Sequence, residues 1–172
     1  MSAGGSTMCS FPGGVDFIVP TPRGYPDSME AGGLMYHDYS VSRPLNGTST
    51  SCVMQGMTNN PTPGNPNAAS SQGTPNNATM FGQNNFVTSY ATHDLNTGAP
   101  VVVNIAGVND GSQFGPGYVA RYTRNGRAYT VGEGTNWKQS PYITGHGVGF
   151  IANQLTWGSQ MSDIIGRCGC GN

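Results

Sequence analysis

The chain has 172 residues, a formal net charge of −1 and only 9% charged residues, together with 27 glycines and 12 prolines. So little charge and so many helix breakers exclude a helix bundle or a coiled coil, since an average soluble domain carries about 25% charged residues. Seven scattered basic residues supply few phosphate contacts, and no apolar run reaches the length of a membrane span, so we expect neither a nucleic-acid partner nor a membrane span.

The N-terminal half predicts short strands between turns and loops. Residues 1–35 are rich in turn formers, and the apolar run 15–19, followed by two prolines, favours an edge strand. Residues 34–41 alternate in part like a strand, and residues 50–57 fit either a strand or a short helical turn. Residues 58–85 are polar, nearly uncharged and rich in Asn and Pro, which predicts a long loop.

The C-terminal half is more regular. Residues 86–90 and 100–106 predict strands, and the second is apolar enough to be buried on both faces. Residues 118–124 and 127–131 flank Asn125-Gly126, a pair that tolerates the positive φ angles of a type I′ turn, so we expect a β-hairpin. Alternation separates the hairpin into two faces, one with Val119, Arg121 and Thr123 and the other with Tyr118, Ala120 and Tyr122.

Residues 148–165 have helical spacing. The expected inner stripe is Phe150, Ile151, Leu155 and either Met161 or Ile164, and Gly158 weakens the helix. The patterns together predict one mainly β domain over residues 1–172, made of short antiparallel strands, long Gly/Pro/Asn-rich loops and one C-terminal helix. Within it, we expect a loop-rich segment at 58–85 and a better-ordered hairpin and helix portion at 98–172.

Four cysteines, Cys9, Cys52, Cys168 and Cys170, allow three disulfide pairings in an oxidising compartment. Cys168 and Cys170 are too close in sequence for an unstrained bridge, so a bridge from the tail to Cys9 or Cys52 is expected. The alternative is a metal site that uses the Cys-x-Cys pair and distant ligands.

Cys52 is also a candidate nucleophile with His37 as its base. The pair resembles that of L,D-transpeptidases, although Thr50 and Ser51 stand where that family has His-Gly before the cysteine. The resemblance implies a small delivered cysteine-dependent hydrolase or transpeptidase that acts on peptidoglycan, as the alternative function. The segment 143–149 is similar to a lipase nucleophile elbow, but glycine stands at the nucleophile position, so we expect no acyl transfer there.

Two further groups could bind ligands. His37, His93 and His146 could hold a structural zinc ion, the cofactor that imidazoles favour, if the fold brings them together. Arg121, Arg124 and Tyr122 of the hairpin could pair with and stack on an acidic or nucleotide ligand. The alternatives are isolated surface histidines and a solvent-facing hairpin whose charges keep the protein soluble.

The middle of the chain resembles the PAAR-like spike-tip domains of contractile secretion systems. The resemblance is carried by glycines and apolar positions in 53–61, 70–73, 80–82, 86–88 and 98–102. It implies short strands that form a cone on a trimeric spike, often around a structural metal. We therefore expect a structural component of an extracellular, phage-like or contractile-injection assembly rather than an enzyme: a spike tip, a decoration protein or a filament subunit.

Such a component would bind protein partners or further copies of itself. Sparse charge and abundant Asn, Thr, Ser and Gly favour an extracellular or particle-associated location, although no secretory signal is visible at the N-terminus.

Overall fold

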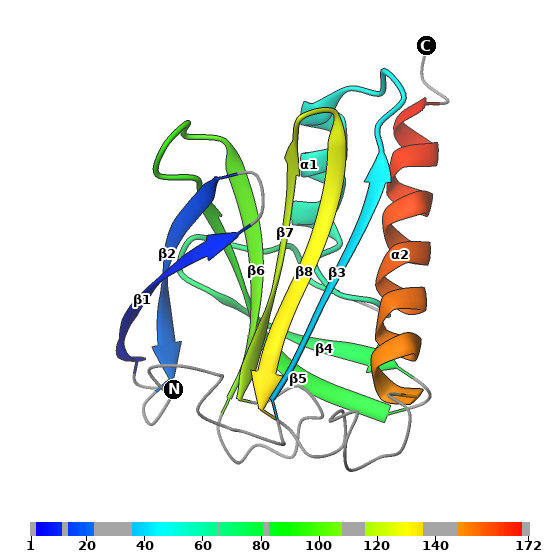
Figure 1. The fold of residues 1–172 in the computed structure, drawn as a ribbon. Helices are drawn as coiled ribbons and strands as arrows, with labels where there is room; N and C mark the ends of the chain where they lie inside the picture. Colours follow the sequence, from blue (N-terminus) through cyan, green and yellow to red (C-terminus); the bar gives the residue numbers. More distant parts are fainter. Residues whose placement is uncertain are drawn as a thin grey trace.

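The main sheet has six antiparallel strands in the order β3-β8-β7-β6-β5-β4, as Figure 1 shows. The computed structural model describes residues 3–11, 14–22, 36–64, 66–80, 83–107, 116–135 and 148–169. The strands of this sheet are β3 (Tyr36–Pro44), β4 (Thr74–Met80), β5 (Gln83–His93), β6 (Pro100–Ala106), β7 (Gly117–Arg124) and β8 (Arg127–Thr135).

Two further layers cover the sheet. Helices α1 (Thr50–Asn59) and α2 (Val148–Gly169) pack on one face, and a two-stranded sheet of β1 (Ala3–Phe11) and β2 (Val15–Pro22) lies on the other. The mainly β class, the antiparallel sheet and the C-terminal helix are thus confirmed. Of the two helices that the structure describes, neither is apolar enough to span a bilayer.

The central strand and the hairpin follow their local patterns. In β6, Val101 and Val103 face the layer formed by β1 and β2, whereas Val102 faces the helices, and all three are buried. Asn125 and Gly126 have φ angles of 49° and 72°, which confirms the positive φ angles expected for the β7–β8 turn.

Helix α1 resolves the ambiguity of residues 50–57 in favour of helix, so the strand alternative is wrong. The Ser49 side chain caps the helix by accepting a hydrogen bond from Cys52 N at 3.4 Å. Val53, Met54 and Met57 are buried towards the sheet and α2, because this spacing places them on one face. The domain therefore has a second helix besides the C-terminal one.

The prediction of loop throughout 58–85 is wrong for residues 58–59, which end α1, and for residues 74–80 and 83–85, which belong to β4 and β5. Strand β4 forms because it pairs with β5, and its Asn76 side chain bonds to Asn67 N, Asn67 O and Ser89 Oγ. Pro75 is tolerated because β4 is an edge strand of the sheet.

The turn-rich residues 1–35 contain two strands, β1 and β2, which form an antiparallel pair. Both are edge strands of this two-stranded sheet, so the edge strand expected at 15–19 is confirmed.

Helix α2 begins at the expected residue and extends four residues beyond the expected end. Met161 and Ile164, of which one was predicted to be buried, are both buried, and so is Trp157, which the predicted stripe omitted. The side chains of Phe150, Ile151 and Leu155 lie outside the described residues. At Gly158 an added Cβ would lie 2.7 Å from Arg43 Nη2, so this glycine lets α2 approach β3 closely.

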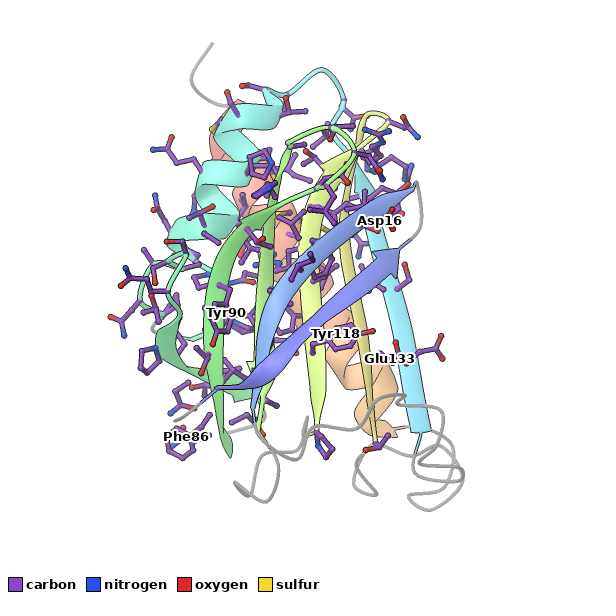
Figure 2. All side chains as sticks on the ribbon, turned by 90° about the vertical axis from the view of Figure 1, so that its left-hand side faces the viewer. Asp16, Phe86, Tyr90, Tyr118 and Glu133 are labelled. Carbon is purple, nitrogen blue, oxygen red and sulfur yellow. A yellow bond between two sulfur atoms is a disulfide. The ribbon has the colours of Figure 1, made fainter. Side chains whose placement is uncertain are left out.

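A buried carboxylate joins β2 to the main sheet. Asp94, in the turn between β5 and β6, accepts hydrogen bonds from Thr97 Oγ1 at 2.6 Å and from the backbone amides of Asp16 and Asn96 at 3.1 Å each. Leu95 N in turn donates to Asp16 O at 2.7 Å. Val15 and Phe17 of β2 are thereby held in the apolar cluster, and Figure 2 shows β1 and β2 crossing this face of the sheet diagonally.

Protonation of Asp94 at low pH should lower the free energy of unfolding. The Thr97 hydroxyl, more than any other group, lowers the pKa of Asp94 from 3.8, and the Asp16 and Asn96 amides and the Arg124 charge add to this against the opposing effect of burial. The ionised Asp94 carboxylate therefore stabilises the fold fully above pH 3.8. This stabilisation is lost as the pH falls through the lower pKa that Asp94 has in the folded protein. Urea denaturation between pH 6 and about pH 2.5 should show this loss. Asp94→Asn should remove part of it, and an unchanged pH profile in that variant would contradict the assignment.

The contact between α1 and α2 yields a matched pair of glycine variants. An alanine Cβ at Gly56 would lie 2.6 Å from Ile164 Cγ2, whereas Gly166 faces open space. Gly56→Ala should lower the free energy of unfolding by about 1–2 kcal/mol, because overpacking outweighs the gain in helix propensity. Gly166→Ala should raise it by about 0.5–1 kcal/mol. Denaturant titrations that show equal effects of the two changes would contradict this packing.

Candidate functional site

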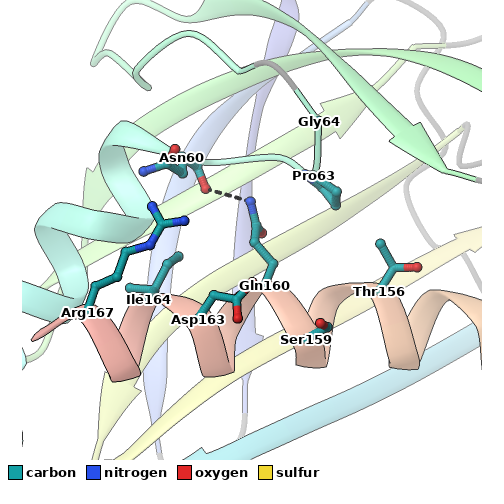
Figure 3. Close-up of a pocket in the computed structure, with 9 residues that line it drawn as sticks. All are labelled: Asn60, Pro63, Gly64, Thr156, Ser159, Gln160, Asp163, Ile164 and Arg167. Carbon is teal, nitrogen blue, oxygen red and sulfur yellow. Dashed lines mark hydrogen bonds between the residues drawn. The ribbon is translucent and has the colours of Figure 1, made fainter. Parts of the chain in front are cut away.

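A groove of about 530 Å³ runs between α2 and the segment that follows α1 (Figure 3). Its volume lies within the range of about 300–1,000 Å³ typical of ligand sites. One wall is α2, and the other is the segment 60–64. The lining residues are Thr156, Ser159, Gln160, Asp163, Ile164 and Arg167 of α2, and Asn60, Pro63 and Gly64 opposite them.

Gln160 connects the two walls of this α2 groove. Its Nε2 donates to Asn60 O at 3.2 Å and to Thr62 O at 2.7 Å, and Figure 3 shows the first of these bonds. Its Oε1 accepts a hydrogen bond of 2.8 Å from Arg121 Nη1. Because both ends of the amide are engaged, Gln160 acts as a positioning residue of the groove.

Arg121 supports the groove from inside the protein, where its side chain has no exposed surface. Besides Gln160, its guanidinium donates to Asn60 O at 3.0 Å and Thr130 Oγ1 at 3.2 Å, and its Cζ lies 5.3 Å from the ring centroid of Trp157. A buried cation is costly unless its hydrogen bonds are made. The guanidinium therefore constrains the positions of the Asn60 carbonyl and of α2.

A chain of buried amides and one hydroxyl holds the opposite wall on the sheet. Asn104 Nδ2 donates to Pro61 O at 2.9 Å, and its Oδ1 accepts from Ser89 Oγ at 2.6 Å. Ser89 Oγ accepts from Asn76 Nδ2 at 2.9 Å, and the same Nδ2 donates to Asn67 O. Both walls are thus held by hydrogen bonds to the β-sheet core.

The accessible chemistry of the groove is polar. Ser159, Asp163 and Arg167 are exposed, and their positions along α2 place them on one side of the helix. They offer a hydroxyl, a carboxylate and a guanidinium within about two helical turns. The groove is therefore suited to a polar ligand or polypeptide segment that brings both donors and acceptors.

Cys52 is bonded to Cys168, so the structure selects one of the expected long-range bridges. The bridge joins the first turn of α1 to the last turn of α2, with 5.8 Å between the Cα atoms. A bridged sulfur carries no thiolate, so the nucleophile hypothesis requires this bond to be reduced. His37 occupies β3 opposite Gly134, and its side chain lies outside the described residues.

The three candidate zinc ligands are not seen together. His93 is exposed at the end of β5, where it pairs with Pro100, and His146 lies outside the described residues. No group of three or more His, Cys, Asp or Glu side chains gathers in the part of the chain that the structure describes. The zinc site remains a prediction.

The candidate ligand residues of the hairpin lie in three different surroundings. Arg121 is buried beneath the helices, so it does not face solvent. Tyr122 is buried on the opposite face, with its ring stacked at 5.2 Å on Tyr129, and burial raises its pKa. Arg124, at the end of β7, is partly exposed. The alternation of the strand, which was predicted, is what separates Arg121 from Tyr122.

Sequence reasoning missed the α2 groove, although one signal was present. Polar residues stand at 156, 159, 160, 163 and 167, a spacing that places them along one side of the helix that was expected from residue 148. Such a polar stripe is typical of any solvated helix face. Only the approach of segment 60–64 turns it into the wall of a groove.

Comparisons of the chain with protein-family models, curated proteins and solved structures found no match.

The role of Gln160 can be tested against its exposed neighbour. Gln160→Ala removes the acceptor of Arg121 Nη1 and the donor to Thr62 O, so it should lower the free energy of unfolding by about 1–3 kcal/mol. Ser159→Ala should change it by less than about 0.5 kcal/mol, because Ser159 is exposed. Urea denaturation measures both variants. Equal stability of the two proteins would show that Gln160 does not connect the walls.

Proposed function

We propose that the protein is a structural component of an extracellular or particle-associated assembly, in which it binds protein partners or further copies of itself. The observation that carries the proposal is the Cys52–Cys168 bridge. Disulfides persist in secreted and surface-exposed proteins and are rare in reducing compartments. A spike tip, a decoration protein and a filament subunit are forms that such a component takes.

The bridge also favours a rigid binding surface. It links positions separated by 116 residues in the sequence and connects α1, which leads into one wall of the α2 groove, to α2, which forms the other. A cross-link over so long a loop restricts the unfolded chain strongly. The polar α2 groove, whose walls are connected by the hydrogen bonds of Gln160, is a surface on which a polypeptide partner could be bound without first ordering the site.

The outer surface is consistent with contacts in an assembly. The chain has only 9% charged residues, and a surface covered by neighbouring subunits needs fewer of the charges that keep a monomer soluble. Among the residues that the structure describes, three large apolar side chains are exposed: Phe86 (60%), Ile18 (47%) and Leu95 (46%). Phe86 of β5 lies on the side of the molecule seen in Figure 2, which β2, the strand of Ile18, crosses. This side offers apolar area to a partner.

Native mass spectrometry of the purified protein, before and after thiol alkylation, tests the proposal. We expect oligomers or a stable complex with a partner, and no alkylation of Cys52 or Cys168 until the protein is reduced, because the two sulfurs are bonded. A protein that stays monomeric, without a partner, and whose folded form is rapidly alkylated at Cys52 would overturn the proposal in favour of a thiol enzyme.

A double variant without the bridge measures how much the Cys52–Cys168 disulfide contributes to stability. Cys52→Ala with Cys168→Ala should lower the free energy of unfolding by about 2–5 kcal/mol. Under reducing conditions wild type and double variant should converge in stability.

A further inference from the structure

A second pocket, of about 370 Å³, lies at the tip of the β7–β8 hairpin, where the hairpin meets the start of α1. It shares no lining residue with the α2 groove. The side chains that matter for its chemistry are those of Thr50 and Ser51 from α1, and of Thr123, Arg124 and Asn125 from the hairpin. All of them carry hydrogen-bond donors.

The two arginines that flank the hairpin turn differ in their hydrogen bonds. Arg127 donates from Nε and Nη2 to Ser42 Oγ, at 3.1 and 2.9 Å. Arg124 Nε is buried and has no hydrogen-bond partner among the described residues. The acceptor for Nε is therefore supplied by solvent or by a bound ligand.

The negative charge found to act on Arg124 among the described residues is that of the Asp94 carboxylate, and no hydrogen bond joins the two side chains. The carboxylate of Asp94 is close enough for its charge to interact with that of Arg124, but it already accepts hydrogen bonds from Thr97 and from the Asp16 and Asn96 amides. The first turn of α1 contains no acidic residue. The positive end of the α1 dipole therefore adds to the positive potential of the pocket.

We propose that this hairpin-tip pocket binds a small oxyanion, a carboxylate or a phosphate group, through the Arg124 guanidinium with the Thr50 and Ser51 hydroxyls as further donors. Guanidinium groups bind both oxyanions through two parallel hydrogen bonds, which gives the contact a defined orientation. The site does not depend on the proposed assembly function, since it uses a different surface of the protein.

The test is an NMR titration of the full-length oxidised protein with inorganic phosphate and, separately, with acetate, at constant ionic strength set by chloride. We expect saturable shifts of the amide signals of Thr50, Ser51 and Asn125 with at least one of the two anions. Saturation by phosphate alone identifies a phosphate site, and saturation by acetate that is at least as tight identifies a carboxylate site. Shifts that fail to saturate with either anion would overturn the proposal.

Arg124→Ala and Arg127→Ala form the matched pair of variants. Arg124→Ala should weaken anion binding by about tenfold or more, because it removes the charge-assisted hydrogen bonds. Arg127→Ala should change binding by less than about threefold, because screening reduces the effect of a charge outside the pocket. Equal weakening in both variants would show a general effect of charge and would overturn the site.

A second substitution covers the case in which Arg124→Ala does not fold. Ser51→Asp places a carboxylate beside the pocket in the first turn of α1, where an acidic residue is favourable to the helix. The variant should fold and should bind the anion at least about tenfold more weakly. Undiminished binding in a folded Ser51→Asp protein would also overturn the proposal.

Discussion

The Arg121 guanidinium lies beneath α2, and its hydrogen bonds join four elements of the fold. From β7 it reaches Thr130 of β8, the Asn60 carbonyl that follows α1, and Gln160 of α2. Replacing these acceptors by apolar groups would leave a charge in the core, which costs several kcal/mol. The helix layer is therefore constrained by the need to solvate one buried cation, and the α2 groove lies directly over the residues that solvate it.

Helix α1 is held at both of its ends. Its first turn is bonded to the end of α2 through Cys52 and Cys168, and the carbonyl of Asn60, the residue after its last, accepts hydrogen bonds from Arg121 and Gln160. The α2 groove lies near the C-terminal end of α1 and the hairpin-tip pocket near its N-terminal end. A short helix is marginal by itself, so both sites depend on this double attachment.

The proposed roles use different parts of the surface. A protein partner would contact the α2 groove or the apolar side chains exposed on the side of β1 and β2, whereas a small anion would bind at the hairpin tip. The bridge supports both roles because it limits the motion of α1 relative to α2. Rigid surfaces bind with a smaller loss of conformational entropy, which suits a component that must present the same face in every copy of an assembly.

The sequence by itself determined the elements whose signals are local. The Asn125-Gly126 turn, the apolar run of β6 and the helical spacing from residue 148 each predicted their element, because backbone conformation there follows from neighbouring residues. Tertiary structure decided the rest: that Thr74–Met80 is a strand, that Cys52 pairs with Cys168, and that Arg121 is buried. Alternation along a strand separates two faces, but it does not tell which one the helices cover. The α2 groove likewise required segment 60–64 to meet a helix about a hundred residues away, a contact for which local pattern carries no signal.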